Sequence, residues 1–156
     1  MQDSGRIIGH MVESIGRADE STEPFHHLHL DGVFPREVYS AMTAHLPAAA
    51  MYRPMSGRAR EAQRPDGTPT RTKMHLLPEF IRRMPPRQRE VWAPVGEVLC
   101  SALVREAFVR RLAVGLEKRF GAIYGRVDMC ALPILTRDVA GYKIGVHPDT
   151  RHKGIT

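Results

Sequence analysis

Residues 132–156 of the chain read LPILTRDVAGYKIGVHPDTRHKGIT, and this stretch decides which fold we expect. The pattern over residues 127–138 is typical of a strand interrupted by a proline, and residues 141–149 are typical of a second strand that is entered through a glycine turn. Side chains two positions apart on a strand project from the same face. His147 and Asp149 can therefore point at one metal ion, and we predict that both are metal ligands.

The pair formed by His147 and Asp149 has the chemistry of a known type of iron site. Non-haem Fe(II) is bound in many oxygenases by two histidines and one carboxylate on one face of the metal, which leaves the opposite face open. A histidine and an aspartate two apart also occur at ordinary strand ends, with the histidine in solvent and the aspartate in a turn. His152 is close enough in sequence to substitute as a ligand, although we expect it in a turn that faces solvent. Spacing alone leaves these alternatives open.

The wider stretch resembles the metal-binding segment of the Fe(II)- and 2-oxoglutarate-dependent oxygenases. In that family a strand with an Arg-Asp pair, a short loop and a Gly-Tyr pair precede His-x-Asp, and a turn, a lysine and the next strand follow it. The positions of this chain that match are Arg137, Asp138, Gly141, Tyr142, His147, Asp149, Lys153 and residues 154–156. Residues 24–47, PFHHLHLDGVFPREVYSAMTAHLP, are similar to the strand and helix that precede the barrel in several branches of the family.

The resemblance implies a fold, an activity and two cofactors. The fold is α+β, with N-terminal helices packed on an incomplete double-stranded β-helix, a jelly-roll or cupin-like sheet. The enzyme would hydroxylate a small-molecule or amino-acid-like substrate with O2 and decarboxylate 2-oxoglutarate as co-substrate. The metal is Fe(II), held by His147 and Asp149. Related halogenases carry a small residue in place of the carboxylate, so Asp149 favours hydroxylation.

The family places its third iron ligand, a histidine, and the basic anchor of 2-oxoglutarate on later strands of a barrel of about eight strands. Only residues 150–156 follow Asp149 here, and the last of them resemble the apolar start of a strand, whose backbone donors and acceptors would be unpaired. We therefore expect that the chain is the first part of a longer product and lacks a complete site by itself. An unpaired strand edge would also allow self-association.

Three residues near the motif are weaker site candidates. Counting back from His147, strict alternation places Lys143 on the same face and Tyr142 on the opposite one, unless a bulge at a glycine reverses the order. We take Tyr142 and Lys143 as candidate cofactor-binding residues, and a strand lysine in solvent is the alternative. Arg137 is a candidate for bidentate binding of a substrate carboxylate, or it pairs with Asp138 in a structural role.

Upstream of the motif, the chain divides into two parts. Residues 1–23 are expected to form a flexible N-terminal segment, with a short, poorly anchored helix and a polar linker. Residues 24–156 are expected to form the oxygenase part. In this part we predict a strand over residues 25–31 and a helix from Pro35 to Pro47.

The middle of the chain is predicted to be a loop followed by helices. Residues 48–73 are rich in Arg, Pro, Gly and Thr and are typical of a long basic loop. Residues 77–120 are strongly helical in pattern. We predict two helices there, with a break near Ser101, a kink at Pro94 and a C-terminal cap at Gly121.

The closely spaced His26, His27 and His29 form another candidate metal cluster. Neighbouring side chains on a strand diverge, and no cysteine or carboxylate completes a tetrahedral set. We therefore expect half-buried strand histidines and no bound metal here.

The chain has 156 residues, a mass of 17.6 kDa and a formal net charge of +6. This size fits one domain or a part of one, and the charge should attract anions. The second hypothesis is therefore a non-enzymatic basic module that binds an anionic partner such as nucleic acid through residues 48–73 and the arginine-rich helices. Aromatic residues make up only 6% of the chain, which leaves few platforms for stacking bases, so nucleic acid is the less expected partner. The partner that the resemblance implies is a small molecule.

Cysteine content and hydropathy indicate the cellular location. Cys100 and Cys130 are too few for a disulfide framework and lack CxxC spacing, so we predict buried thiols in a reducing cytoplasm. No apolar run approaches the roughly 20 residues that a membrane-spanning helix needs, and the N-terminus lacks a basic segment followed by an apolar one. The expected location is the cytoplasm, with no membrane partner.

Overall fold

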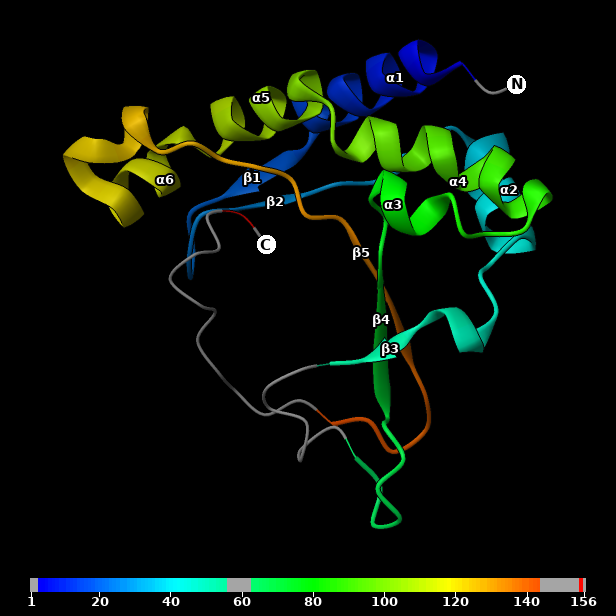
Figure 1. The fold of residues 1–156 in the computed structure, drawn as a ribbon. Coiled ribbons are helices and arrows are strands. Elements are labelled where there is room, and N and C mark those ends of the chain that lie inside the picture. Colours follow the sequence, from blue (N-terminus) through cyan, green and yellow to red (C-terminus); the bar gives the residue numbers. More distant parts are fainter. Residues whose placement is uncertain (1–2, 56–62, 144–154, 156) are drawn as a thin grey trace.

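A computed structural model describes residues 3–55, 63–143 and 155 of the chain. The described part is mixed α+β, as predicted, with helices and two small antiparallel sheets. Helices α1 (Ser4–Arg17), α5 (Ala102–Arg111) and α4 (Pro86–Leu99) form a layer across the top of Figure 1. The sheet of β3 (Arg53–Pro54), β4 (Arg71–His75) and β5 (Ile134–Asp138) extends below this layer. None of the described helices is long and apolar enough to cross a membrane.

Helix α1 (Ser4–Arg17) is a central part of the core. The side chains of Ile7, Met11 and Ile15 are almost fully buried, because their spacing of four residues places them on one face of the helix. That face packs against α4 and α5. Each such side chain contributes about 1.5–3 kcal/mol through burial. The helix is therefore longer and better anchored than the sequence pattern indicated.

The polar segment after α1 forms a strand and not the linker that we expected. Strand β1 (Asp19–Ser21) pairs antiparallel with β2 (His27–His29), so that Asp19 lies opposite His29. The strand predicted over residues 25–31 is confirmed only for these central residues. The pairing ties the polar segment to the chain that follows it.

Helix α2 (Arg36–Ala44) follows Pro35, which is its N-cap residue, and the prediction of a helix here is confirmed. Val38 is fully buried on its inner face. The indole N–H of Trp92 donates a hydrogen bond of 2.8 Å to the carbonyl oxygen of His45. This bond joins the C-terminal end of α2 to α4.

The predicted helical region holds four helices and not two: α3 (Pro78–Ile81), α4 (Pro86–Leu99), α5 (Ala102–Arg111) and α6 (Ala113–Phe120). The break near Ser101 is confirmed, since the Ser101 hydroxyl accepts a hydrogen bond from the Val104 N–H and caps α5. Gly121 ends α6 at a φ of 64°, as predicted. Pro94 lies inside α4, which continues past it to Leu99.

The cysteines differ from expectation. Cys100 and Cys130 are both exposed free thiols. Cys100 is the C-cap residue of α4, and Cys130 lies in irregular chain after the short 3-10 helix η2 (Gly121–Arg126). Neither cysteine thus lies inside a helix or strand. The prediction of buried thiols was wrong.

The second sheet positions the candidate site. Its order is β3 (Arg53–Pro54), β4 (Arg71–His75) and β5 (Ile134–Asp138), all antiparallel neighbours. Strands β4 and β5 run side by side in Figure 1 although they are far apart in sequence. Of the two strands predicted at the C-terminal end, the first is confirmed from Ile134 to Asp138, and most of the second lies outside the described residues.

Strand β4 lies within residues 48–73 and just beyond, a stretch that we predicted to be a loop. The same stretch also holds the 3-10 helix η1 (Ala49–Met51) and β3. Met74 of β4 lies opposite Leu135 of β5, and both belong to the hydrophobic core or pack against it. One face of the sheet thus covers the core, and alternation directs Lys73 to the other face.

Candidate functional site

The two predicted iron ligands, His147 and Asp149, lie outside the described residues. The structure does describe the chain that leads to them, which is β5 and residues 139–143. The candidate site is therefore built from the end of the β4–β5 pair. Within residues 3–55, 63–143 and 155, no group of three or more His, Cys, Asp or Glu side chains is placed to hold a metal ion.

Backbone hydrogen bonds fix the turn at the end of β5. The N–H of Val139 donates to the carbonyl oxygen of Thr70 at 3.0 Å, which extends the β4–β5 pairing past Asp138. The N–H of Tyr142 then donates to the carbonyl oxygen of Val139 at 3.1 Å. Gly141 between them has a φ of 95°, a value that glycine adopts without steric cost. The predicted glycine turn is therefore present.

An ion pair crosses the two strands at this turn. The Arg71 guanidinium donates to both carboxylate oxygens of Asp138, from Nε at 2.7 Å and from Nη2 at 2.6 Å. These hydrogen bonds hold the pKa of Asp138 below its ordinary value and raise the pKa of Arg71. Asp138 is thus a charged carboxylate whose partner comes from the neighbouring strand.

The same arginine also contacts Tyr142. Its guanidinium carbon lies 4.0 Å from the centre of the Tyr142 ring, a cation–π contact. Arg71 therefore links the carboxylate of Asp138 to the aromatic ring of Tyr142. The sequence analysis missed Arg71 because this residue lies in the predicted loop. The strand that holds it has a single buried residue, Met74, which is too weak a pattern to indicate a strand.

Arg137 does not pair with Asp138, although the sequence left that pairing open. It lies opposite Thr72 in the register, on the face of the sheet that covers the core, whereas Asp138 lies opposite Arg71 on the other face. Arg137 is exposed. Burial raises the pKa of Tyr52, and the positive charge of Arg137 acts in the opposite direction, so these two side chains lie close enough to interact.

Lys143, the other predicted cofactor-binding residue, is exposed, whereas Tyr142 is half-buried. The structure therefore brings Tyr142 and Asp138 together through Arg71. It places Arg137 on the opposite face of the sheet.

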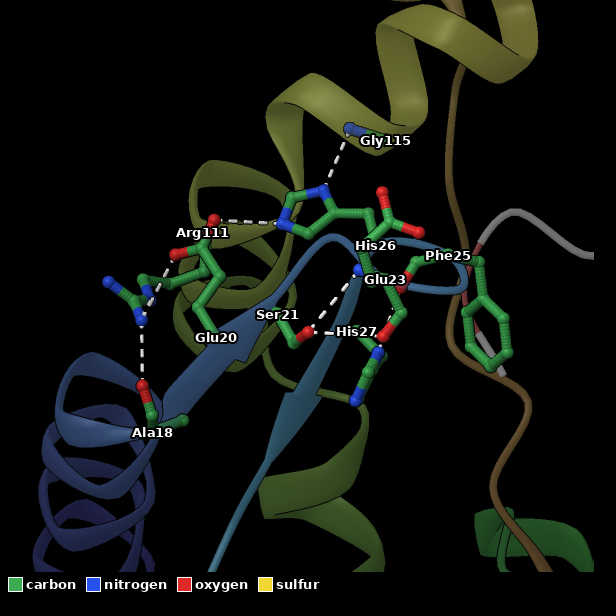
Figure 2. A network of polar contacts seen from close by, with 9 residues as sticks. All are labelled: Ala18, Glu20, Ser21, Glu23, Phe25, His26, His27, Arg111 and Gly115. Carbon is green, nitrogen blue, oxygen red and sulfur yellow. Dashed lines mark hydrogen bonds and ion pairs between the residues drawn. The ribbon is translucent and has the colours of Figure 1, made fainter.

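The histidine cluster has a structural role at His26. Gly115 N–H donates to His26 Nδ1 at 2.9 Å, so the neutral ring carries its proton on Nε2 and donates it to Glu20 at 2.8 Å. Arg111 contacts the other carboxylate oxygen of Glu20 at 3.2 Å and donates to the carbonyl oxygen of Ala18 at 2.8 Å. Figure 2 shows this network between the β1–β2 hairpin and α6.

The other two histidines differ from His26 in their surroundings. His27 Nδ1 is hydrogen-bonded to the carbonyl oxygen of Phe25 at 2.8 Å, and His29 is exposed. Both ring nitrogens of His26 are engaged with protein groups, which leaves none for a metal. The sequence neighbours His26 and His27 are thus engaged with different groups.

A shallow surface groove between α1 and α5, lined by Ile8, Val12 and Leu103 among others, contains none of the predicted site residues. The end of the β4–β5 pair therefore remains the candidate site. No protein-family model, curated protein or solved structure matches this chain.

Proposed function

We propose that this chain supplies part of the active site of an Fe(II)/2-oxoglutarate-dependent oxygenase, which hydroxylates a small-molecule or amino-acid-like substrate. The observation that supports this most is the order of elements before the His-x-Asp motif. Residues Ile134–Asp138 form a strand, and a turn at Gly141 follows it directly. A strand with an Arg-Asp pair, a short loop and a Gly-Tyr pair is the order that the resemblance implies.

The donor set of the motif suits Fe(II). An imidazole nitrogen and a carboxylate oxygen are two of the three ligands that non-haem iron oxygenases use. In the proposal His147 and Asp149 hold the metal, and the third ligand and the anchor of 2-oxoglutarate come from sequence C-terminal to Asp149. The iron, once bound with 2-oxoglutarate, would supply the oxidative chemistry.

Arg71 has a positioning role in this proposal. Its bidentate bond to Asp138 joins β4 to the last residue of β5, and its contact with Tyr142 reaches past the turn. The chain is thereby held on both sides of the turn that precedes the motif. A metal site benefits from such support, because ligand positions must hold within about 0.5 Å.

The finer features of the resemblance belong to the same proposal. We assign the sheet β3–β4–β5 to one wall of an incomplete double-stranded β-helix. Tyr142 and Lys143 are proposed to contact 2-oxoglutarate, and Arg137 is proposed to contact a substrate carboxylate. Because Arg137 lies on the opposite face of the sheet from Arg71, its role requires that the substrate approaches from the side of Tyr52.

The proposal is tested by measuring succinate formation and bound iron in the protein at the length that the cell produces. With Fe(II), 2-oxoglutarate and O2 we expect succinate, and His147→Ala and Asp149→Ala should each lower its rate and the iron content at least about 100-fold. His152→Ala removes a nearby histidine and is the matched control, with both quantities unchanged. A wild-type protein that binds no iron, or a His147→Ala variant with normal turnover, would contradict the proposal.

A further inference from the structure

Two cations face each other across β3 and β4. Arg53 lies directly opposite Lys73 in the register, so both side chains project from the same face of the sheet. The opposite face carries Met74 and covers the core. The Arg53–Lys73 pair therefore lies on the face that is turned away from the described core.

This arrangement is unfavourable unless an anion is present. Side chains directly opposite each other on antiparallel strands have Cβ atoms about 5 Å apart, and like charges at this position destabilise a sheet. Within the described part of the chain, neither Arg53 nor Lys73 has an ion-pair partner. Asp138, the acidic residue that β5 places on this face, is already bound at both carboxylate oxygens by Arg71.

The polar surroundings complete a small anion site. Thr136 lies opposite Lys73 on its other side, in β5, so its hydroxyl is on the same face. A guanidinium can bind a carboxylate through two parallel hydrogen bonds, and an ammonium adds a point charge with donors that rotate. Arg53, Lys73 and Thr136 thus present a fork, a charge and a hydroxyl from three adjacent strands.

We propose that Arg53 and Lys73 bind the carboxylate of a small organic acid on this face of the sheet. The site has two cations, which is enough to bind one carboxylate group. Binding of nucleic acid, in contrast, depends on contacts with many phosphates and on stacked bases. The ring of Tyr142, at the end of the β4–β5 pair, already has the Arg71 guanidinium over it. The site needs neither iron nor the His-x-Asp motif, so it stands or fails independently of the oxygenase.

Calorimetric titration of the full chain with citrate and with 2-oxoglutarate, in metal-free buffer of low ionic strength, tests the site. We expect saturable binding of both acids, because the site recognises the carboxylate. Binding of 2-oxoglutarate alone would contradict this and assign the face to the co-substrate. Binding of a DNA oligonucleotide with no binding of citrate would contradict it too.

Single substitutions separate a local site from diffuse charge. Lys73→Gln and Arg53→Gln should each weaken citrate binding at least about tenfold, whereas Arg87→Gln, which removes the same charge from the exposed surface of α4, should leave it unchanged. Equal weakening by all three substitutions would overturn the proposal, as would the absence of citrate binding to the wild-type chain.

A charge reversal controls for folding. Arg53→Glu creates an ion pair with Lys73, so the variant should melt at or above the wild-type temperature and should not bind citrate. A lower melting temperature, or retained citrate binding, would show that the two side chains do not face each other as proposed.

Discussion

His26 caps helix α6 from the β1–β2 hairpin, because its Nδ1 accepts the N–H of Gly115 at 2.9 Å. Gly115 is the third residue of α6, and the first N–H groups of a helix have no partner within the helix. The ring is nearly buried, with 8% of its side chain exposed. A histidine distant in sequence thus does what a serine or aspartate does at most helix starts.

Gly115→Ala should destabilise the protein, although alanine is the better helix former. A Cβ at Gly115 would lie 2.7 Å from His26 Nδ1 and 2.9 Å from His26 Cβ, so the hairpin or the helix has to move. Overpacking of this kind costs about 1–3 kcal/mol. Gly9→Ala in α1 is the matched control, because no atom lies within 4 Å of its Cβ, and it should stabilise by about 0.5–1 kcal/mol. Urea unfolding measures both changes, and a stabilised Gly115→Ala variant would contradict the packing.

Arg71→Gln should remove a pH-dependent part of the stability. The pKa of Asp138 is lowered in the folded state, so its contribution is present above the ordinary value of 3.8 and is lost as the pH falls through the folded value. At neutral pH we expect a loss of no more than about 1 kcal/mol, since the pair is partly exposed and water screens it. The free energies of unfolding of the wild type and of Arg71→Gln, measured against pH, should converge below pH 3.8.

The control for that experiment is Arg137→Gln. Arg137 precedes Asp138 in sequence but lies on the other face of β5. Its removal should leave the difference in stability between pH 7 and pH 3 unchanged. If Arg137→Gln and not Arg71→Gln flattens the pH dependence, Asp138 pairs with its sequence neighbour after all.

Trp92→Phe should cost about 1–3 kcal/mol of unfolding free energy. The substitution removes the indole N–H that donates to the His45 carbonyl oxygen at 2.8 Å, and it leaves that acceptor without this donor next to the core. Tyr124→Phe removes a hydroxyl whose bond to the Val109 carbonyl oxygen is 3.5 Å long and weak, so it should change the stability little. Equal effects of the two changes would contradict the anchoring of α2 to α4.

The Cys100 thiol should react slowly with iodoacetamide at neutral pH although it is exposed. Partial burial raises its pKa, and the negative charge of Glu79 raises it further, so the reactive thiolate is scarce. Glu79→Gln should therefore speed up the alkylation of Cys100. Mass spectrometry reports Cys100 and Cys130 separately, and the rate at Cys130 serves as the internal control. An unchanged rate at Cys100 would exclude the effect of Glu79.

Sequence patterns predicted the elements whose signals are local. Helix α2 after Pro35, the break near Ser101 and the end of α6 at Gly121 each depend on residues within one turn of chain. Strand β4 could not be predicted in this way. It has five residues and a single buried side chain, and its stability comes from β5, about 65 residues later.

At the candidate site, too, features with local signals were predicted and features that depend on distant strands were not. The strand at Ile134–Asp138 and the turn at Gly141 were predicted from the local pattern. Arg71 was not, because only the pairing of distant strands places it beside Asp138 and Tyr142. The face occupied by Arg137 followed from the register, which no pattern in a single strand specifies.

The position of β4 in the middle of its sheet sets an order of assembly on the ribosome. One of its edges can pair with β3 as soon as residues 71–75 emerge, but the other has no partner until residues 134–138 have been made. Helices α3 to α6 lie between these two segments and are synthesised in the interval. The helical layer can therefore form first, and the last strand closes the sheet onto a surface that already exists.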